Sequence, residues 1–337
     1  MTAIEGNAFA RAGLLGNPSD GYGGKVLSVA IRNFSARVRI EESRRLTFIP
    51  SAGDEESYPS IGEFVDRIGL YGYYGSLRLV KAAFRKFCLY CRDNGIVHHD
   101  RFFAAWVESD IPRQVGLGGS SAIVTAAMRA FMAYYEVDIP IEVQPSVILS
   151  AERDELDINA GLQDRVAQVY EGCVYMDFDP EIVRRTGSGR YERLDPALLP
   201  PLYLAYKPSL GKVSGRVLNE IKVKFDRGDA ATIETLKKIA ALAERGRNAL
   251  LAGDRVLFSA LMDENFDLRR TIMTINPANR EMIEAARRAG ASAKFAGSGG
   301  SVIGVVRSDA HFAAVEEALS GIGAVVIRPI LEERKPQ

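Results

Sequence analysis

The stretch IPRQVGLGGSSAIVTAAM, residues 111–128, places small residues where a helix is expected to begin. Three glycines and two serines stand there between a proline and a run of helix-forming residues. The first turn of a helix has backbone N–H groups without partners and carries the positive end of the helix dipole, so it suits an anion. We therefore predict that this loop binds phosphate, although glycine-rich loops also occur as plain tight turns. The predicted contacts are Gly116, Leu117, Gly118, Gly119, Ser120, Ser121 and Ala122.

The loop does not follow the P-loop pattern G-x-x-x-x-G-K-[ST], which occurs nowhere in the chain. It partly follows the dinucleotide pattern G-x-G-x-x-G, because Gly116 and Gly118 are present and Glu136 stands where the ribose-binding acid is expected. However, Ser121 occupies the third glycine position, and the loop follows a proline and an arginine. A nicotinamide-dependent enzyme therefore remains an alternative.

The two serines allow two interpretations. A serine at a helix start can cap the helix, and beside bound phosphates its hydroxyl can also bind Mg²⁺. A magnesium site needs a carboxylate nearby. The segment 150–170 offers five of them, Glu152, Asp154, Glu155, Asp157 and Asp164. Asp164 stands at an expected helix start among apolar and amide neighbours, where it could be a cap or a general base.

Cys88 and Cys91 form a C-x-x-C pair, with His98 and His99 a few residues further on. A zinc site needs four ligands in a compact arrangement, and its C-x-x-C pair usually stands in a turn. Both cysteines fall inside the helical pattern LRLVKAAFRKFCLYC, where positions three apart share one face. We therefore interpret them as core residues rather than metal ligands.

The bulk composition is that of an ordinary globular protein, with 47% hydrophobic and 26% charged residues. The 337 residues allow one large domain or two of ordinary size. Lys+Arg and Asp+Glu both number 43, so the net charge is zero and no basic surface for nucleic acid is indicated. We find no apolar run of about 18 residues that would cross a membrane and no signal peptide. We expect a cytoplasmic protein, monomeric or homodimeric.

Hydrophobic periodicity predicts an α+β protein with two lobes. Strands are expected within 9–50, 101–112, 172–178 and 201–208, and in the strand–turn–strand–helix–strand pattern that ends the chain. Helices are expected within 60–94, from the glycine loop to about Tyr135, at 145–156 and 162–170, and over most of 212–290. A boundary between the lobes is expected near Pro200–Pro201.

Three motifs of this chain resemble, in the same order, the three motifs of the GHMP small-molecule kinases, which include galactokinase and mevalonate kinase. The motifs are FARAGLLGNPSDGYGG, GLGGSSA and KFAGSGGSV, and the resemblance spans residues 8 to 330. It implies a ribosomal S5-like N-terminal lobe and a ferredoxin-like C-terminal lobe, which we place at residues 1–200 and 201–337. It also implies ATP and Mg²⁺ as cofactors and a small-molecule substrate.

The resemblance assigns roles to particular residues. The spacing of the family's metal-binding glutamate and catalytic aspartate selects Glu152 and Asp164. Gly119 is an extra small residue in the second motif, so either Ser120 or Ser121 could bind the metal. Arg11 takes the place of a cation in the first motif, where it would keep Asp164 ionised and stabilise the charge in transit. The third motif would bring its backbone close to the phosphate loop through Gly297, Ser298, Gly299 and Gly300.

The first motif also contains the residues that hold sugar hydroxyls in galactokinase. This chain has GNPSDGY there, in which Asp20 and Tyr22 match, whereas Asn17 and Pro18 depart. The departure argues against galactose as the substrate. We expect Asn17, Ser19, Asp20 and Tyr22 to line the sugar site.

Several strings outside the general motifs resemble one branch of the family, the plant-type glucuronokinases. They are GNPSDGYGGK, YGYYGSLRL, IPRQVGLGGSSAIV, LSAERDELDINAGLQDRVAQVYEG and NFDLRR. The resemblance implies phosphorylation of D-glucuronate on its anomeric hydroxyl. A uronate carboxylate needs a cationic partner, preferably an arginine. The candidates are Arg113, Arg165 and Arg269, and Tyr22 and Tyr73 could also contact the sugar.

Two alternatives remain within the same fold. The first is another anomeric sugar kinase, acting on heptose 7-phosphate, arabinose or galactose. The second is a sugar-binding regulator that has lost catalysis. The presence of Glu152, Asp164 and Arg11 argues against the regulator, because a sensor has no need of a metal-binding carboxylate and a base.

Overall fold

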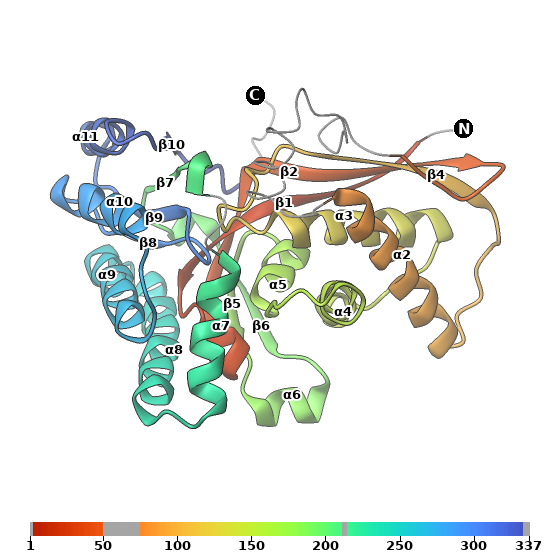
Figure 1. Cartoon of the computed structure of the whole chain (residues 1–337), viewed down its shortest axis with the longest axis horizontal. Coiled ribbons are helices and arrows are strands. Elements are labelled where there is room, and N and C mark those ends of the chain that lie inside the picture. The colour runs from red at the N-terminus through yellow and green to blue at the C-terminus, as the bar shows by residue number, and fades with distance from the viewer. Residues whose placement is uncertain (1–2, 50–74, 211–213, 333–337) are drawn as a thin grey trace, which may run out of the picture. The chain divides into compact units, whose positions relative to one another are not determined.

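The computed structural model describes residues 3–49, 75–210 and 214–332, and the chain folds into two compact units (Figure 1). The first unit comprises Met1–Ala10, Phe34–Ile111 and Gly118–Val169, and the second comprises Arg11–Asn33, Pro112–Leu117 and Tyr170–Gln337. Each unit is therefore built from segments that are far apart in the sequence. Two long strands, β1 (Ile4–Leu15) and β2 (Lys25–Ser43), run from one unit into the other.

In the first unit, helices pack on strands of a six-stranded sheet. Strand β4 (Phe102–Ser109) pairs antiparallel with residues 36–43 of β2 and parallel with β3 (Thr47–Ile49). Helix α2 packs against β3, β4, α3 and α4, and α3 also packs against β4 and α4. The helices of this unit are α2 (Ser76–Asp93), α3 (Gly119–Tyr135), α4 (Gln144–Leu156) and α5 (Gln163–Tyr170).

An aromatic cluster fills the core of the first unit. Phe84 of α2 contacts Phe103 of β4 and both Phe131 and Tyr135 of α3, and Phe87 contacts the same two residues of α3. Burying one such side chain contributes about 1.5–3 kcal/mol. Helix α2 forms because its apolar residues recur at helical spacing and share this buried face.

The C-x-x-C pair lies on α2, as the helical pattern predicted. Cys91 is buried and Cys88 is partly exposed. Burial raises the pKa of both thiols. The burial of Cys91 and the partial burial of Cys88 in this helix agree with the core interpretation.

The second unit contains strands of two sheets. Residues 25–29 of β2 pair antiparallel with β5 (Cys173–Asp177), which pairs antiparallel with β6 (Arg190–Leu194). A second sheet is antiparallel throughout, in the order β10-β7-β9-β8. Its strands are β7 (Leu202–Tyr206), β8 (Lys294–Phe295), β9 (Ser301–Val305) and β10 (Val325–Ile327).

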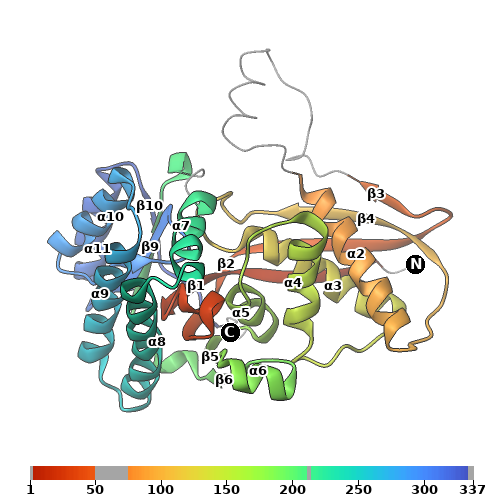
Figure 2. The ribbon, with the colours of Figure 1, turned by 60° about the horizontal axis from the view of Figure 1, so that its bottom comes forward.

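The helices of the second unit lie largely around this second sheet. They are α6 (Pro180–Thr186), α7 (Ser214–Asp226), α8 (Ala230–Leu251), α9 (Arg255–Ile272), α10 (Pro277–Arg288) and α11 (Asp309–Ser320), and short 3₁₀ turns span Ser19–Tyr22, Pro196–Leu198 and Pro208–Leu210. Helices α8 and α9 run side by side (Figure 2), α9 and α10 contact β9, and α11 contacts β10. In chain order, the strands of this sheet lie as fourth, first, third and second, with helices after the first and third. This is the ferredoxin-like arrangement that the resemblance implied.

The predicted α+β class is confirmed, and the predicted helices and strands agree with those observed in the described residues. The part of the predicted helical stretch at 60–74 lies outside the described residues. Helix α6 and strand β6 were not predicted from the sequence. Asp179 and Pro180 supply start signals for α6, because the Asp179 side chain accepts a hydrogen bond from the Glu181 N–H at 2.8 Å. The expected lobe boundary near residue 200 stays a prediction.

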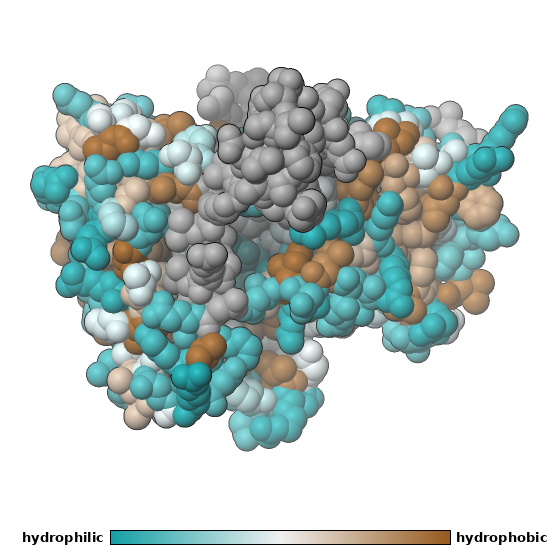
Figure 3. Space-filling view, viewed as in Figure 1, coloured by the Kyte–Doolittle hydropathy of each residue, from teal (hydrophilic) through white to brown (hydrophobic). Residues whose placement is uncertain are grey.

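The described helices include none that is long and apolar enough to cross a membrane. On the face drawn in Figure 3, polar and charged side chains predominate among the described residues, and apolar ones gather only in small groups.

Candidate active site

The glycine loop leads into a helix start, as predicted. Helix α3 begins at Gly119, and Gly118 before it is the N-cap residue, with a left-handed φ of 75°. Gly116 also has a φ of 75°, a conformation that glycine adopts without steric cost. The capping interpretation of the serines is wrong, because the N-cap residue is a glycine without a side chain. The start of α3 therefore keeps the features of an anion site.

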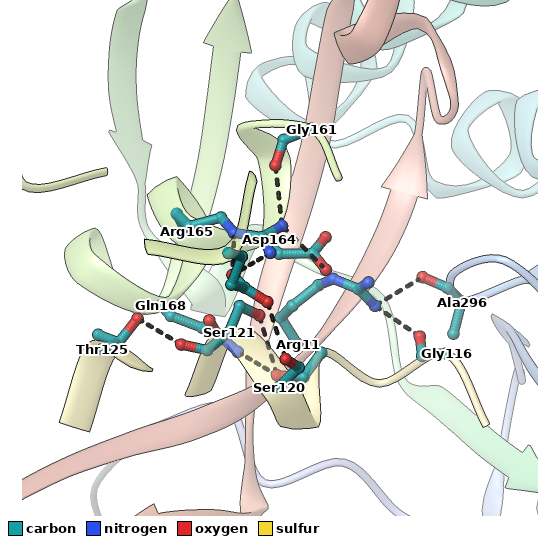
Figure 4. Close-up of polar contacts among 12 residues, drawn as sticks. Arg11, Gly116, Ser120, Ser121, Thr125, Gly161, Asp164, Arg165, Gln168 and Ala296 are labelled. Carbon is teal, nitrogen blue, oxygen red and sulfur yellow. Dashed lines mark hydrogen bonds and ion pairs between the residues drawn. The ribbon is translucent and has the colours of Figure 1, made fainter. Parts of the chain in front are cut away.

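The two serines make different contacts (Figure 4). The Ser120 hydroxyl donates a hydrogen bond to Oε1 of Glu152 at 2.8 Å. The Ser121 hydroxyl donates to the carbonyl of Gly118 at 3.0 Å. Ser120 is therefore the serine beside the carboxylate, a distinction that the sequence left open.

Glu152, on α4, is a carboxylate without exposure to solvent (0%). Its Oε2 accepts hydrogen bonds from Nε of Arg165, at 2.8 Å, and from Nη2 of the same arginine. A buried carboxylate is costly unless its charge is paired and its oxygens are hydrogen-bonded. Arg165 and Ser120 together meet both conditions.

Asp164 lies in the first turn of α5, one residue inside the helix, with 23% of its side chain exposed. Its Oδ2 lies 3.8 Å from Nη1 of Arg165, and the same Nη1 donates to the carbonyl of Gly161 at 2.9 Å. One turn further on, Nε2 of Gln168 donates to the carbonyl of Gly118 at 2.8 Å. Helix α5 therefore ties Asp164 and Arg165 to the start of α3 and to α4 in the first unit.

In the second unit, the guanidinium of Arg11 lies on the backbone of two motifs (Figure 4). Its Nη1 donates to the carbonyl of Gly116 at 2.6 Å and to that of Ala296 at 3.4 Å. The backbone N–H of Arg11 donates to the carbonyl of Leu117 at 3.1 Å. Arg11 is thus a buried cation beside the glycine loop.

The second and third motifs approach each other closely within the second unit. A Cβ on Gly116 would lie 2.7 Å from the carbonyl oxygen of Gly299, and one on Gly297 would lie 2.1 Å from the carbonyl oxygen of Gly116. Both distances are shorter than ordinary van der Waals separations of about 3.5–4.0 Å. Asn279 supports the turn by accepting a hydrogen bond from the N–H of Gly300 at 2.8 Å. The close backbone approach implied by the resemblance is therefore observed, while Ser298 between these glycines is only partly buried.

Two residues of the first motif serve its internal structure. Asn17 is buried, and its Oδ1 accepts a hydrogen bond from Nζ of Lys294 at 2.6 Å. Ser19 is also buried, and its hydroxyl donates to the carbonyl of Lys25 at 2.9 Å. Their predicted contact with a sugar stays a prediction.

Asp20 and Tyr22 are both partly exposed, and their predicted contact with a sugar stays a prediction. The ring of Tyr22 packs on Phe225, 4.6 Å between centroids. Burial, together with the charges of Asp20 and Asp226, raises the pKa of Tyr22 to about 12, so its hydroxyl stays protonated and can donate a hydrogen bond. Tyr73 lies outside the described residues.

The three arginine candidates have different surroundings. Arg113 is exposed, in the loop that leads to Gly116. Arg165 pairs with Glu152 as described above. Arg269 is 1% exposed, and its Nη1 donates to the carbonyl of Gly297 at 2.7 Å. Burial lowers the pKa of Arg269 to about 10, which still leaves it protonated at neutral pH.

Lys294 is a buried cation that the sequence analysis did not identify. Its Nζ donates to the carbonyl of Gly13 at 2.7 Å, to Oδ1 of Asn17 at 2.6 Å and to the carbonyl of Phe295 at 2.8 Å. Burial, with the nearby charges of Arg269 and Arg11, lowers its pKa well below 10.5. A lysine inside an apolar strand, next to a glycine motif, is the signal that could have found it.

The Glu152–Ser120 pair has the chemistry of a partial Mg²⁺ site, because Mg²⁺ prefers carboxylate and hydroxyl oxygens. In the part of the chain that the structure describes, no cluster of three or more His, Cys, Asp or Glu residues could hold a metal ion. A cation here would therefore depend on phosphate oxygens and water for its remaining ligands, as Mg²⁺ commonly does in kinases. The residues present fit that mode of binding.

Two family models match the chain, GHMP kinases N terminal domain at residues 78–172 and GHMP kinases C terminal at residues 247–324. The chain belongs to the GHMP kinase family. Membership of a kinase family excludes the nicotinamide-dependent alternative.

Within the family, the chain is similar to two proteins of Arabidopsis thaliana. It is 44% identical to Glucuronokinase 1 over 307 residues, which are 89% of this chain and 84% of that protein. It is 45% identical to Probable glucuronokinase 2 over 307 residues, 89% of this chain and 83% of that protein. The fold is similar to that of Streptococcus pneumoniae phosphomevalonate kinase in complex with phosphomevalonate and AMPPNP, with a TM-score of 0.75 at 15% identity, covering 97% of this chain and 100% of the other.

Proposed function

We propose that this protein is an ATP-dependent sugar kinase that phosphorylates D-glucuronate on its anomeric hydroxyl, forming D-glucuronate 1-phosphate and ADP. The observation that carries the proposal is the identity of 44% and 45% to two glucuronokinases over 89% of the chain. The partly exposed Asp164, the buried Glu152 and the partly buried Ser120 are side chains of the types that such a transfer needs.

In the proposed reaction, the anomeric oxygen attacks the γ-phosphorus of ATP, the bond from that phosphorus to the bridging oxygen breaks, and ADP leaves. Asp164 accepts the hydroxyl proton as the new bond forms. The start of α3 holds phosphate oxygens through its N–H groups, and Arg11 stabilises negative charge on the transferred group. When held by Glu152 and Ser120, Mg²⁺ would neutralise charge on the β- and γ-phosphates.

The carboxylate of glucuronate requires a cation, and the surroundings of the three candidates differ enough to choose among them. Arg165 and Arg269 are almost completely buried, with 3% and 1% of their surface exposed. Arg113 is exposed on the approach to Gly116. We therefore assign the carboxylate to Arg113, whose guanidinium can form a fork of hydrogen bonds with it.

Replacing Arg113 tests this assignment. Arg113→Ala is expected to raise the KM for glucuronate by about tenfold or more, because hydrogen bonds to charged groups contribute roughly 1.5–3 kcal/mol. The KM for ATP should stay unchanged, and Arg113→Lys should restore part of the loss. Arg184→Ala, which removes another exposed arginine of the second unit, is the matched control. A wild-type KM for glucuronate in Arg113→Ala would contradict the assignment.

A substrate panel tests the function itself. ADP release is measured with glucuronate, galacturonate, galactose, arabinose and heptose 7-phosphate at equal concentration, and the phosphorylated position is read by phosphorus NMR. We expect the fastest turnover on glucuronate and a product phosphorylated at the anomeric oxygen. Faster turnover of a neutral sugar would overturn glucuronate and leave the wider class of anomeric sugar kinases. Binding of ATP without turnover of any sugar would favour a non-catalytic regulator.

The cellular location and the oligomeric state are predicted from the sequence only. A cytoplasmic location and a monomeric or homodimeric state stay predictions.

A further inference from the structure

The two oxygens of Glu152 have different partners. Oε2 accepts both hydrogen bonds from Arg165, whereas Oε1 accepts from the Ser120 hydroxyl at 2.8 Å. Nε and Nη2 of the arginine thus bind the same oxygen, Oε2. The other oxygen, Oε1, accepts from Ser120 near the start of α3 (Figure 4). This division leaves Oε1 and the Ser120 hydroxyl as neighbouring oxygens suited to one cation.

Arg165 uses three of its nitrogens to fix this arrangement. Nε and Nη2 hold Glu152, and Nη1 donates to the carbonyl of Gly161 at 2.9 Å while lying 3.8 Å from Oδ2 of Asp164. The carbonyl of Gly161 belongs to the segment that leads into α5. One guanidinium therefore ties the carboxylate of α4 to the start of the helix that carries Asp164.

We infer that Arg165 is a positioning residue, which holds Oε2 of Glu152 so that Oε1, together with Ser120, is presented to the metal ion. The inference rests on the proposed assignment of Glu152 and Ser120 to Mg²⁺. Mg²⁺ demands near-ideal octahedral geometry, so a carboxylate that rotates loses the ion more readily than one held in place. Arg165 acts through Glu152 and has no direct contact with the substrate in this assignment.

Burial explains why the arginine is needed at this position. The side chains of Arg165 and Glu152 are 4% and 0% exposed, so water cannot replace the hydrogen bonds of the guanidinium. Lysine would keep the charge but offers a single nitrogen, which cannot reproduce a planar fork that reaches both Glu152 and Gly161. Arg165→Lys therefore keeps the positive charge but no longer fixes the orientation of the Glu152 carboxylate. This substitution separates the effect of orientation from the effect of charge.

The test measures metal binding directly, with Mn²⁺ as the probe and AMPPNP as the nucleotide, by electron paramagnetic resonance of free Mn²⁺. Arg165→Lys is expected to weaken Mn²⁺ binding by about 10- to 100-fold, the usual effect of losing a group that orients a metal ligand. Binding of AMPPNP without metal should stay within about twofold of wild type. Arg165→Gln should weaken Mn²⁺ binding at least as much, and if it does not fold, the lysine variant decides.

Arg129 provides a matched control. It is another arginine of the first unit that donates several hydrogen bonds, to the carbonyls of Asn7, Gln168 and Val169. Arg129→Lys should lower the free energy of unfolding without changing Mn²⁺ affinity. An equal loss of Mn²⁺ affinity in Arg129→Lys and Arg165→Lys would overturn the inference, because general loosening of the unit would then explain both.

A double-mutant cycle with Ser120→Ala separates the inference from the proposed function. Coupled losses support an arginine that acts through the carboxylate, and fully additive losses overturn it. Mn²⁺ affinity in Arg165→Lys equal to that of wild type overturns it as well, even if glucuronate is phosphorylated. If the wild-type protein does not phosphorylate glucuronate but Arg165→Lys still weakens Mn²⁺ binding, the proposed substrate is wrong and the inference is supported. Absence of Mn²⁺ binding by the wild-type protein would overturn the metal assignment and the inference together.

Discussion

At the scale of single residues, the acidic groups of the first unit differ in what surrounds them. Glu152 has no exposed surface and both of its oxygens are occupied by protein donors. Asp164 keeps 23% of its side chain exposed and lies 3.8 Å from Arg165. A carboxylate that accepts a substrate proton has to be reachable, whereas one that holds a cation has to be fixed. The two environments match the roles proposed for them.

Asp164→Asn is expected to leave the protein folded and able to bind ATP but to lower kcat by about 10²–10⁴-fold. The amide has nearly the same size but cannot accept the proton of the anomeric hydroxyl. Steady-state kinetics and thermal unfolding measure the two effects. Asp154→Asn is the control, because that carboxylate is exposed on α4 and forms an ion pair with Lys86 at 2.9 Å. A kcat near wild type in Asp164→Asn would show that the carboxylate is not the base.

Glu152→Gln is expected to raise the Mg²⁺ concentration needed for half-maximal activity while changing the KM for the sugar little. It should also lower the free energy of unfolding by about 3–5 kcal/mol, because it removes the charge of the buried carboxylate that pairs with Arg165. Magnesium titrations and urea unfolding measure these quantities. An unchanged magnesium requirement would move the metal ligand to Asp154 or Glu155.

At the scale of elements, the glycine loop contains glycines that the structure requires for different reasons. Gly116 has a positive φ, and its missing Cβ makes room for the backbone of the third motif. Gly119 lies in α3, and a Cβ there would only touch the side chain of Ile111 at 3.5 Å. The extra small residue of this motif is therefore not required by packing.

Gly116→Ala and Gly119→Ala are a matched pair that tests this difference. Gly116→Ala should lower the free energy of unfolding by more than about 1 kcal/mol, because the left-handed backbone and the 2.7 Å contact with Gly299 both oppose a side chain. Gly119→Ala should be neutral or raise stability by up to about 1 kcal/mol, since alanine favours a helix. Urea unfolding without nucleotide measures both. Equal destabilisation by the two substitutions would contradict the assigned backbone approach.

At the scale of the whole molecule, the second unit carries an electrostatic cost that depends on pH. Lys294 is completely buried, and burial together with the charges of Arg269 and Arg11 lowers its pKa well below 10.5. Between this lowered pKa and the unfolded value of about 10.4, the unfolded chain binds more protons than the folded chain. The contribution of Lys294 to the free energy of unfolding therefore rises with pH across that interval.

Lys294→Met removes this dependence. Relative to the variant, the wild-type protein is expected to gain stability as the pH rises from 7 to 9.5, as measured by urea unfolding at each pH. The variant should be less stable overall, because Gly13, Asn17 and Phe295 each lose a hydrogen bond from Nζ. A parallel pH dependence in both proteins would show that the pKa of Lys294 is not lowered.

The sequence by itself determined the α+β class, most helices and strands, the glycine loop before α3 and, through three ordered motifs, the family. These features depend on local patterns: periodicity, turn residues and motif spacing are all written within a few tens of residues. Segments of mixed polarity such as α6 and β6 were missed, because short elements rich in charge and turn residues resemble loops.

Only the tertiary structure decided which side chains meet. Ser120 rather than Ser121 contacts Glu152, 32 residues away, and Arg165 contacts Glu152 rather than standing open to a substrate. Arg11 meets Gly116 across 105 residues, and Lys294 meets Asn17 across 277. Neighbouring positions in one motif look equivalent in the sequence, and the direction of a side chain follows from the packing of distant segments. Burial makes an unpaired charge costly, so Lys294 and Arg165 need hydrogen-bond acceptors. The packing of distant segments brings these acceptors close to them.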